Sequence, residues 1–246
     1  MPTTDTITPR GSMPGLQEKD KFVREMFNGI SHRYDFLNHF LSAGIDRIWR
    51  KAAMKLSGLS GGDAFLDVAC GTGDLSIEAV KSEPARIVGV DFAENMLHSF
   101  EAKKDKLGLD GRIDIVQASA ESLPFAEGSF DVTAVAFGAR NFANLVAGLS
   151  EMRRVLKRGG RIVVLEFSKP RRFPVKQLYF FYFRRVLPLI GKMVSGNGGA
   201  YTYLPDSVSR FPDGEDFLNV MRAVQFKDVS RVELTFGIAT AYVGVK

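Results

Sequence analysis

The 246-residue chain has few of the residues that build disulfides and metal sites. Its single cysteine, Cys70, excludes an internal disulfide, and three histidines are too few to favour a structural zinc site. The sequence also lacks a run of 18 or more apolar residues, the length that a bilayer-spanning helix needs. These absences predict a cytoplasmic protein with no metal ion.

Acidic residues are missing from one segment of the chain. The formal net charge is +5, yet no Asp or Glu occurs between Phe167 and Pro205, where seven basic residues occur: Lys169, Arg171, Arg172, Lys176, Arg184, Arg185 and Lys192. The positive charge is therefore local. A local excess favours one interaction surface over a generally basic, nucleic-acid-binding protein.

The composition and periodicity of the N-terminal part predict a tail followed by helices. Residues 1–16 are rich in Thr, Pro and Gly without an apolar core, which is typical of a disordered tail and not of a signal peptide. Apolar residues then recur at helical spacing within 17–57. We expect residues 17–246 to form a single domain that begins with N-terminal helices over 17–57.

The central block alternates apolar strand-like runs with helical stretches, a pattern that predicts an α/β fold with parallel strands. Helices are expected from Asp74, from Ala93 and near Leu145–Leu156, where the Gly159-Gly160 pair would end the last one. Two alternating runs within 229–245 predict an antiparallel pair at one sheet edge. The expected strands of the parallel block are Ala64–Ala69, Ile87–Asp91, Ile113–Ala118, Phe130–Phe137 and Arg161–Phe167.

A glycine turn follows the first of these strands and is the strongest sign of a ligand. Gly71 and Gly73 form the turn, and Asp91 ends the next strand about 20 residues on, the spacing of a nucleotide-binding βαβ unit. A dinucleotide fingerprint would have a third glycine where Ser76 stands. Asp74, at the start of the helix, would repel a phosphate there.

A nucleoside without phosphates is therefore the favoured ligand. S-adenosylmethionine fits this description, because its ammonium and sulfonium groups can face carboxylates or carbonyls and its ribose diol can donate to Asp91.

The segment over 169–211 breaks the alternating pattern. Pro174 can begin a helix that is apolar on more than one face. Two interpretations remain open: a cap helix that packs on the core, or a lid that also touches a membrane surface. Six of the seven basic residues lie on or just before this helix, which favours the lid.

Several motifs together resemble those of class I methyltransferases, and more narrowly those of the menaquinone and ubiquinone biosynthesis C-methyltransferases. The resemblance covers roughly residues 20–246 and implies a Rossmann-like, mostly parallel seven-stranded sheet with an antiparallel edge strand, N-terminal helices and a helical lid insertion. The motifs begin at Leu66 (LDVACGTG), Val90 (VDFAENM), Ala120 (AESLPF), Phe137 (FGARNF) and Arg153 (RRVLKRGG), and the narrower ones at Arg33 (RYD), Gly44 (GIDRIWR) and Tyr203 (YLPDSV).

The resemblance also implies site residues. Thr72 and Gly71 in the turn, Asp91 at the ribose, and Ser119 with Ala120 beside the adenine would bind S-adenosylmethionine, and no metal is implied. The family often has Asn where this chain has Ser119 and Ser where it has Ala136, so the side-chain hydrogen bonds at these two positions stay open.

Two further residues are candidates for the chemistry. Arg140 would stabilise a phenolate, with a structural salt bridge as the alternative, and Tyr34 would hydrogen-bond the acceptor hydroxyl or relay its proton, with a packed aromatic as the alternative.

The implied activity is C-methylation of a polyprenylated demethylmenaquinol, the last step of menaquinone biosynthesis, with a polyprenyl methoxy-benzoquinol of the ubiquinone route as the alternative. The implied partners are the quinol and, transiently, the inner face of the cytoplasmic membrane, with no nucleic acid. Isoprenoid length and oligomeric state stay open, a homodimer being one option. The competing classes are an RNA methyltransferase, an NAD(P) oxidoreductase and a non-catalytic binding protein.

Overall fold

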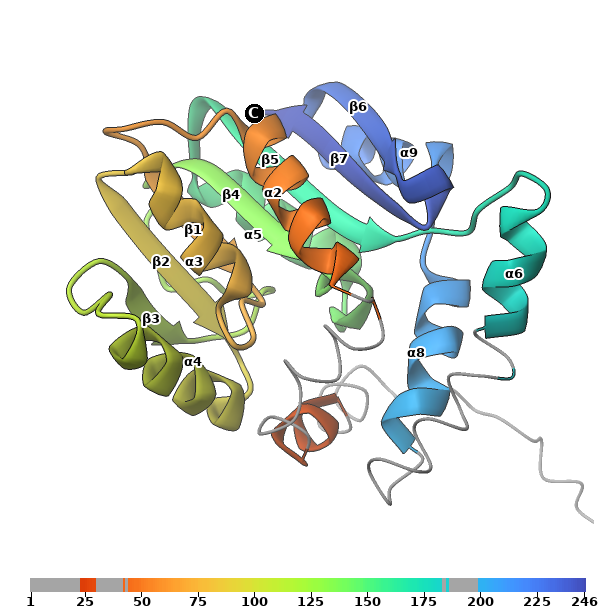
Figure 1. Cartoon of the computed structure of the whole chain (residues 1–246). Helices are drawn as coiled ribbons and strands as arrows, with labels where there is room; N and C mark the ends of the chain where they lie inside the picture. Colours follow the sequence, from red (N-terminus) through yellow and green to blue (C-terminus); the bar gives the residue numbers. More distant parts are fainter. Residues whose placement is uncertain (1–22, 30–41, 43, 183–184, 186–198) are drawn as a thin grey trace, which may run out of the picture.

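A single seven-stranded sheet organises the chain, and its strand order is β3-β2-β1-β4-β5-β7-β6 (Figure 1). The computed structural model describes residues 23–29, 42, 44–182, 185 and 199–246. The strands are β1 Ala64–Val68, β2 Arg86–Asp91, β3 Asp114–Gln117, β4 Phe130–Ala136, β5 Leu156–Phe167, β6 Lys227–Leu234 and β7 Ala239–Val245.

Strands β1 to β5 pair in parallel, whereas β7 runs antiparallel to both of its neighbours, β5 and β6. The predicted mostly parallel seven-stranded sheet, with antiparallel pairing at one edge, is confirmed.

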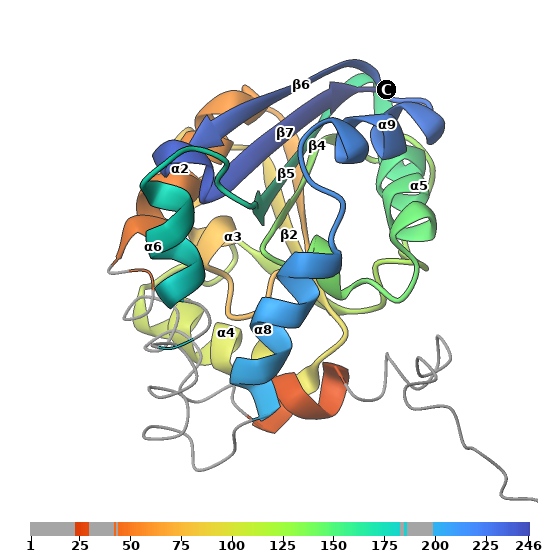
Figure 2. The same cartoon turned by 90° about the vertical axis from the view of Figure 1, so that its right-hand side faces the viewer.

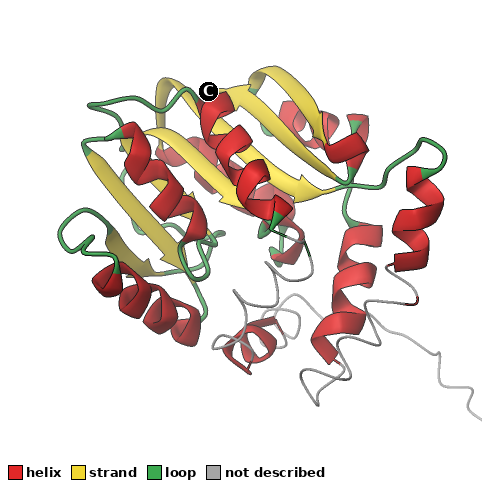
Figure 3. Cartoon of the chain, in the orientation of Figure 1, coloured by secondary structure: helices red, strands yellow, loops and turns green. Residues whose placement is uncertain are grey.

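Helices cover both faces of the sheet (Figure 3). One face carries α2 (Ile45–Ser57), α3 (Asp74–Ala79) and α4 (Glu94–Lys106), and the other carries α5 (Leu145–Val155) and α9 (Glu215–Ala223). Alternate residues of a strand point to opposite faces, so Val163 joins the first core and Val164 the second. Short 3₁₀ turns occur at η1 Val80–Ser82, η2 Ala139–Asn141 and η4 Thr235–Gly237.

Two helices, α6 (Val175–Phe181) and α8 (Gly199–Arg210), lie beyond the carboxyl end of β5 and belong to the segment predicted as a lid (Figure 2). Helix α8 contains Pro205. The expected tail over 1–16 lies outside the described residues, and the N-terminal helices are represented by 23–29 and α2. Within the part of the chain that is described, no helix combines the length and apolar character of a membrane span.

The start of β5 differs from the prediction. The Gly159-Gly160 pair was expected to separate a helix from a strand, but α5 ends at Val155 and β5 begins at Leu156. Leu156 pairs with Phe130 and Arg161 with Val132, so the intervening residues of β5 form a β-bulge. Gly159 has a φ of 77°, which a glycine adopts without strain, so the glycines permit the bulge and do not terminate the helix.

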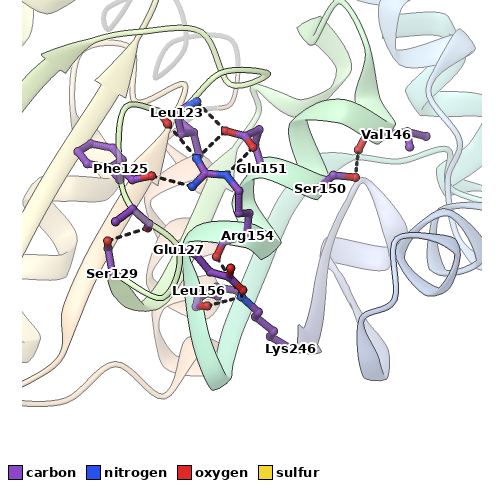
Figure 4. A network of polar contacts seen from close by, with 11 residues as sticks. Leu123, Phe125, Glu127, Ser129, Val146, Ser150, Glu151, Arg154, Leu156 and Lys246 are labelled. Carbon is purple, nitrogen blue, oxygen red and sulfur yellow. Dashed lines mark hydrogen bonds and ion pairs between the residues drawn. The ribbon is translucent and has the colours of Figure 1, made fainter.

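An arginine on α5 fixes the loop between β3 and β4 (Figure 4). Arg154 donates from its two Nη atoms to the carbonyls of Phe125 and Leu123, at 2.7 and 2.9 Å. It also pairs with Glu151, which accepts a 2.9 Å hydrogen bond from the Leu123 N–H. The same loop carries Ser119 and its neighbours, so this network positions one wall of the site described below.

Replacing Arg154 with Met should lower the free energy of unfolding by about 1–3 kcal/mol, because two carbonyls lose their donor and Glu151 loses its partner. Arg153→Met is the matched control, since the Arg153 guanidinium donates to the exposed Gln225 carbonyl. Denaturant titration measures both variants. Equal losses in the two variants would show that the loop does not depend on Arg154.

Candidate active site

A cleft opens at the carboxyl ends of β1, β2 and β4, the edge at which parallel α/β sheets bind ligands. It holds about 830 Å³ of space, counting its open mouth, which lies within the range of small-molecule sites. All five predicted cofactor residues line it: Gly71, Thr72, Asp91, Ser119 and Ala120.

The glycine turn is shaped by the residues around it. Gly71 and Gly73 have φ values of 56° and 82°, in the left-handed region that glycine tolerates. A Cβ on Gly73 would lie 2.0 Å from the ring of Phe100 on α4, so only glycine fits at this position. The turn thus packs closely against α4 and leaves its backbone exposed to the cleft.

Asp91 joins the turn to the next strand. Its two carboxylate oxygens accept hydrogen bonds from the backbone N–H groups of Gly71 at 2.8 Å and Ala93 at 2.9 Å. Burial raises the pKa of Asp91, and these N–H donors oppose that rise. The carboxylate is thereby fixed at the cleft wall, with lone pairs that ribose hydroxyls can use.

A second buried carboxylate, Asp67, was missed by the sequence reasoning. It lies in β1, lines the cleft, and accepts a 2.7 Å hydrogen bond from the Ser76 hydroxyl. Burial raises the pKa of Asp67 from 3.8 to about 7, against the lowering effects of Ser76 and Arg50. The sequence feature that could have identified Asp67 as a site residue is an acidic residue inside an otherwise apolar strand. Ser76, read only as a missing glycine, is the donor that holds this carboxylate.

Asp74 does not act as the sequence argument assumed. Its carboxylate lies 2.8 Å from the Lys103 ammonium, which balances its charge, and 3.5 Å from the guanidinium of Arg50, which also pairs with buried Asp46. Asp74 alone therefore gives little repulsion toward a phosphate. The more deeply buried Asp91, together with Asp67 once it is ionised, supplies the negative charge of the cleft.

The hydroxyl of Ser119 is already engaged in the structure. It donates to a carboxylate oxygen of Glu121, whose other oxygen accepts from the Asn144 N–H at 3.2 Å. Glu121 also lines the cleft and was not predicted. Ala136, the other departure from the family pattern, lines the cleft with a methyl group only.

Arg140 lies beside the cleft and not on its lining. Its guanidinium donates to the Phe137 carbonyl, pairs with fully buried Glu166 at 2.7 Å, and stacks over the Phe167 ring. The salt bridge that sequence reasoning kept as an alternative is thus present. The buried Arg140 Nε has no hydrogen-bond partner among the described residues. The only tryptophan of the sequence, Trp49, packs against both Phe137 and Phe167.

Helices α6 and α8 carry further tyrosines near this region. The Tyr203 hydroxyl on α8 donates to Asn141, a cleft residue, at 3.2 Å. Burial raises the pKa of Tyr179 on α6, which the Arg140 charge opposes. Tyr34 lies outside the described residues. Within those residues, no cluster of three or more His, Cys, Asp or Glu side chains could hold a metal ion.

Comparison with solved structures identifies the fold. The chain superposes on a [4+2]-cyclase, SpnF, with a TM-score of 0.63 at 20% identity, covering 89% of this chain and 76% of that one. It also superposes on a SAM-dependent methyltransferase of Thermotoga maritima, described as a possible histamine N-methyltransferase, with a TM-score of 0.61 at 18% identity, covering 90% and 99%. The predicted Rossmann-like methyltransferase fold is confirmed.

Sequence relatives are more specific. A "Ubiquinone/menaquinone biosynthesis C-methyltransferase UbiE" of Geobacter sp. (strain M21) is 49% identical over 236 residues, 95% of this chain and 100% of the relative. A "Demethylmenaquinone methyltransferase" of Bacteroides fragilis is 44% identical over 230 residues, 93% and 94%. The model of the ubiE/COQ5 methyltransferase family matches residues 15–246. The chain belongs to the ubiE/COQ5 methyltransferase family, whose methyl donor is S-adenosylmethionine.

Proposed function

We propose that the protein transfers a methyl group from S-adenosylmethionine to a ring carbon of a polyprenylated demethylmenaquinol, the last step of menaquinone biosynthesis. The observation that carries this proposal is the cleft with two buried carboxylates in a chain of this family. The name of the Bacteroides relative favours the naphthoquinol, and the name of the Geobacter relative keeps a methoxy-benzoquinol as the second candidate. Family membership sets aside the oxidoreductase and RNA methyltransferase alternatives.

The residues of the cleft fit the methyl donor. Asp91 can accept from the ribose diol, and Asp67 can face a cationic group, because each carboxylate is buried at the end of its strand. We place the adenine beside Ser119 and Ala120, and the rest of the donor along Gly71 and Thr72. When bound, S-adenosylmethionine supplies a methyl group on a positively charged sulfur.

The acceptor needs a negative charge on its ring oxygen before its carbon can attack the methyl group. A fixed cation near that oxygen favours the deprotonated form. We assign this role to Arg140, whose Nε is a buried donor, and we assign a hydrogen bond to the acceptor hydroxyl to Tyr34. Positioning of the two reactants in line supplies much of the remaining acceleration.

The isoprenoid tail of such an acceptor dissolves in membranes, so the enzyme must reach a bilayer. We propose that the segment over 169–190 supplies the apolar slot and that the protein binds peripherally to the inner face of the cytoplasmic membrane. The exposed apolar residues Phe173, Leu178 and Phe181, together with exposed Lys176, support this part of the proposal. A homodimer stays a prediction.

The acceptor is tested by mass spectrometry of quinones from cells that lack the protein. A demethylated naphthoquinone should accumulate, because its methylation is blocked, and the wild-type gene should restore the methylated product. Accumulation of an unmethylated methoxy-benzoquinone would support the second candidate instead. An unchanged quinone pool would contradict both.

Replacing Arg140 with Met should lower kcat about 100-fold, the usual cost of losing a group that stabilises developing negative charge. Affinity for S-adenosylmethionine should stay near the wild-type value, because Arg140 does not line the cleft. Calorimetry and steady-state kinetics measure the two effects separately. Arg140→Lys, which keeps the charge, should recover part of kcat. Both variants also change the ion pair with buried Glu166, so stability does not distinguish the roles; a purely structural role would instead lower donor affinity in parallel with kcat.

Asp67 should make the stability of the ligand-free protein depend on pH. Its raised pKa means that the folded state keeps a proton that the unfolded state has released between pH 3.8 and about 7. The stability contribution of Asp67 is therefore full below pH 3.8 and is lost as pH rises toward 7, by at most about 1.4 kcal/mol per pH unit.

Denaturant titrations of the wild type, Asp67→Asn and Asp114→Asn between pH 5 and pH 8 measure this dependence. Asp67→Asn should flatten it, whereas Asp114→Asn should not, since Asp114 is exposed. Binding of the cationic donor should release a proton below pH 7, because it favours the ionised carboxylate. Identical pH profiles for all three proteins would contradict the assignment.

A further inference from the structure

A second pocket lies apart from the cleft and shares none of its lining residues. It is lined by residues of the loop from β5 to α6, of β6, β7 and the turn between them, and of the segment before α9. These segments touch closely, since a Cβ on Gly237 would lie 3.7 Å from the Pro170 Cα. The pocket holds about 630 Å³, counting its mouth, and its charged lining residues are Lys169, Arg171, Arg172, Arg231, Asp213 and Glu233.

The charges of this pocket do not balance. The Lys169 ammonium lies 3.0 Å from the Asp213 carboxylate, which also accepts from the Lys169 N–H. Arg231 and Glu233 are 4.0 Å apart, the outer limit of an ion pair. Arg171 and Arg172 form no ion pair with any residue that the structure describes. Four basic residues against two acidic ones leave two positive charges uncompensated.

Two of the guanidinium groups converge over a glycine. A Cβ on Gly214 would lie 2.2 Å from Nη1 of Arg231 and 3.1 Å from Nη2 of Arg171. The absence of that Cβ lets both arginines reach the same point. The two positively charged guanidinium groups repel each other, and an anion bound between them would offset that repulsion. Paired guanidinium groups bind phosphate oxygens with short, charge-assisted hydrogen bonds.

The rim of the pocket is apolar and exposed. Phe236 lines the pocket with 75% of its surface exposed, and Phe173, next to Arg172, is 81% exposed. Leu178 and Phe181, on the α6 helix that follows, are also exposed. A soluble phosphorylated ligand gains nothing from such a rim, whereas a membrane surface offers both anionic phosphates and an apolar layer beneath them.

We infer that this pocket binds the phosphate of an anionic phospholipid headgroup, held by Arg171 and Arg231, while Phe173 and Phe236 insert beside it. The inference rests on the proposed membrane-dissolved acceptor, for which it supplies a specific docking point. It gives the β6–β7 turn, which lies far from the lid helices in sequence, a role in membrane recognition.

The test compares two double variants of the full-length protein that lose the same charge. Arg171→Gln/Arg231→Gln removes the pocket arginines, and Arg112→Gln/Arg158→Gln removes exposed arginines near the amino ends of β3 and β5. Cosedimentation with phosphatidylcholine vesicles, with and without phosphatidylglycerol, measures binding. The pocket variant should bind the anionic vesicles about 30-fold more weakly, at about 1 kcal/mol per charge, and the control less than threefold more weakly.

A second pair of measurements identifies the ligand source. Phe173→Ser/Phe236→Ser should weaken vesicle binding but leave any binding of soluble glycerol phosphate unchanged. Tight binding of glycerol phosphate with no preference for vesicles would overturn the lipid assignment in favour of a soluble anion. Arginine-dependent binding to RNA in place of vesicles would overturn it in favour of nucleic acid. Equal losses of vesicle binding in both double variants would also overturn it, because the binding would then depend on total charge and not on this pocket.

A separate assay distinguishes failure of the headgroup-binding hypothesis from failure of the proposed methyltransferase activity. Methylation of a short-chain, water-soluble demethylmenaquinol needs neither a bilayer nor the slot for the isoprenoid tail, so the pocket variant should retain wild-type kcat with it. A wild-type protein that fails to methylate this acceptor would contradict the proposed function. A wild-type protein that methylates it, together with unchanged vesicle binding of the pocket variant, would contradict only the headgroup site.

Discussion

The desolvation of two carboxylates at the ends of adjacent parallel strands is the constraint on which the cleft depends. Asp67 and Asp91 are both buried, burial raises the pKa of each, and the charge of Asp91 raises the pKa of Asp67 further. Such groups require donors at fixed positions. The Ser76 hydroxyl serves Asp67, and the N–H groups of Gly71 and Ala93 serve Asp91. The shape of the glycine turn therefore follows from electrostatics as well as from backbone freedom.

The helices around the cleft also hold the glycine turn and the carboxylates in place, through packing and through charge. The Phe100 ring occupies the space that a side chain on Gly73 would need, so α4 sets how closely the turn approaches the sheet. Arg50 on α2 lies near Asp67 and also contacts Asp74, which Lys103 of α4 neutralises from the other side. Three helices of one face thus stabilise a negatively charged cleft without cancelling its charge, a property suited to a cationic ligand.

Sequence patterns predicted the structural features that depend on residues close together in the chain. The parallel block, the glycine turn and Asp91 follow from strand periodicity and a fixed spacing, and the cleft contains each predicted cofactor residue. Contacts between distant residues were not predictable. The Arg140–Glu166 ion pair spans 26 residues, the Arg50–Asp74 contact spans two elements, and the bulge in β5 depends on its pairing with β4. Arg140, the residue proposed to stabilise the acceptor, takes part in such a contact, which is why its surroundings needed the structure.

The position of the single tryptophan makes its fluorescence useful for binding measurements. Trp49 is buried and donates from Nε1 to the Thr235 hydroxyl at 2.7 Å, while its ring contacts Phe137 and Phe167. Phe137 lines the donor cleft, Phe167 lies under the Arg140 guanidinium, and Thr235 begins the turn beside the headgroup pocket. One indole therefore contacts residues in or next to the three regions for which binding is proposed. Its fluorescence is an intrinsic optical reporter of their occupancy, with no other tryptophan to obscure the signal.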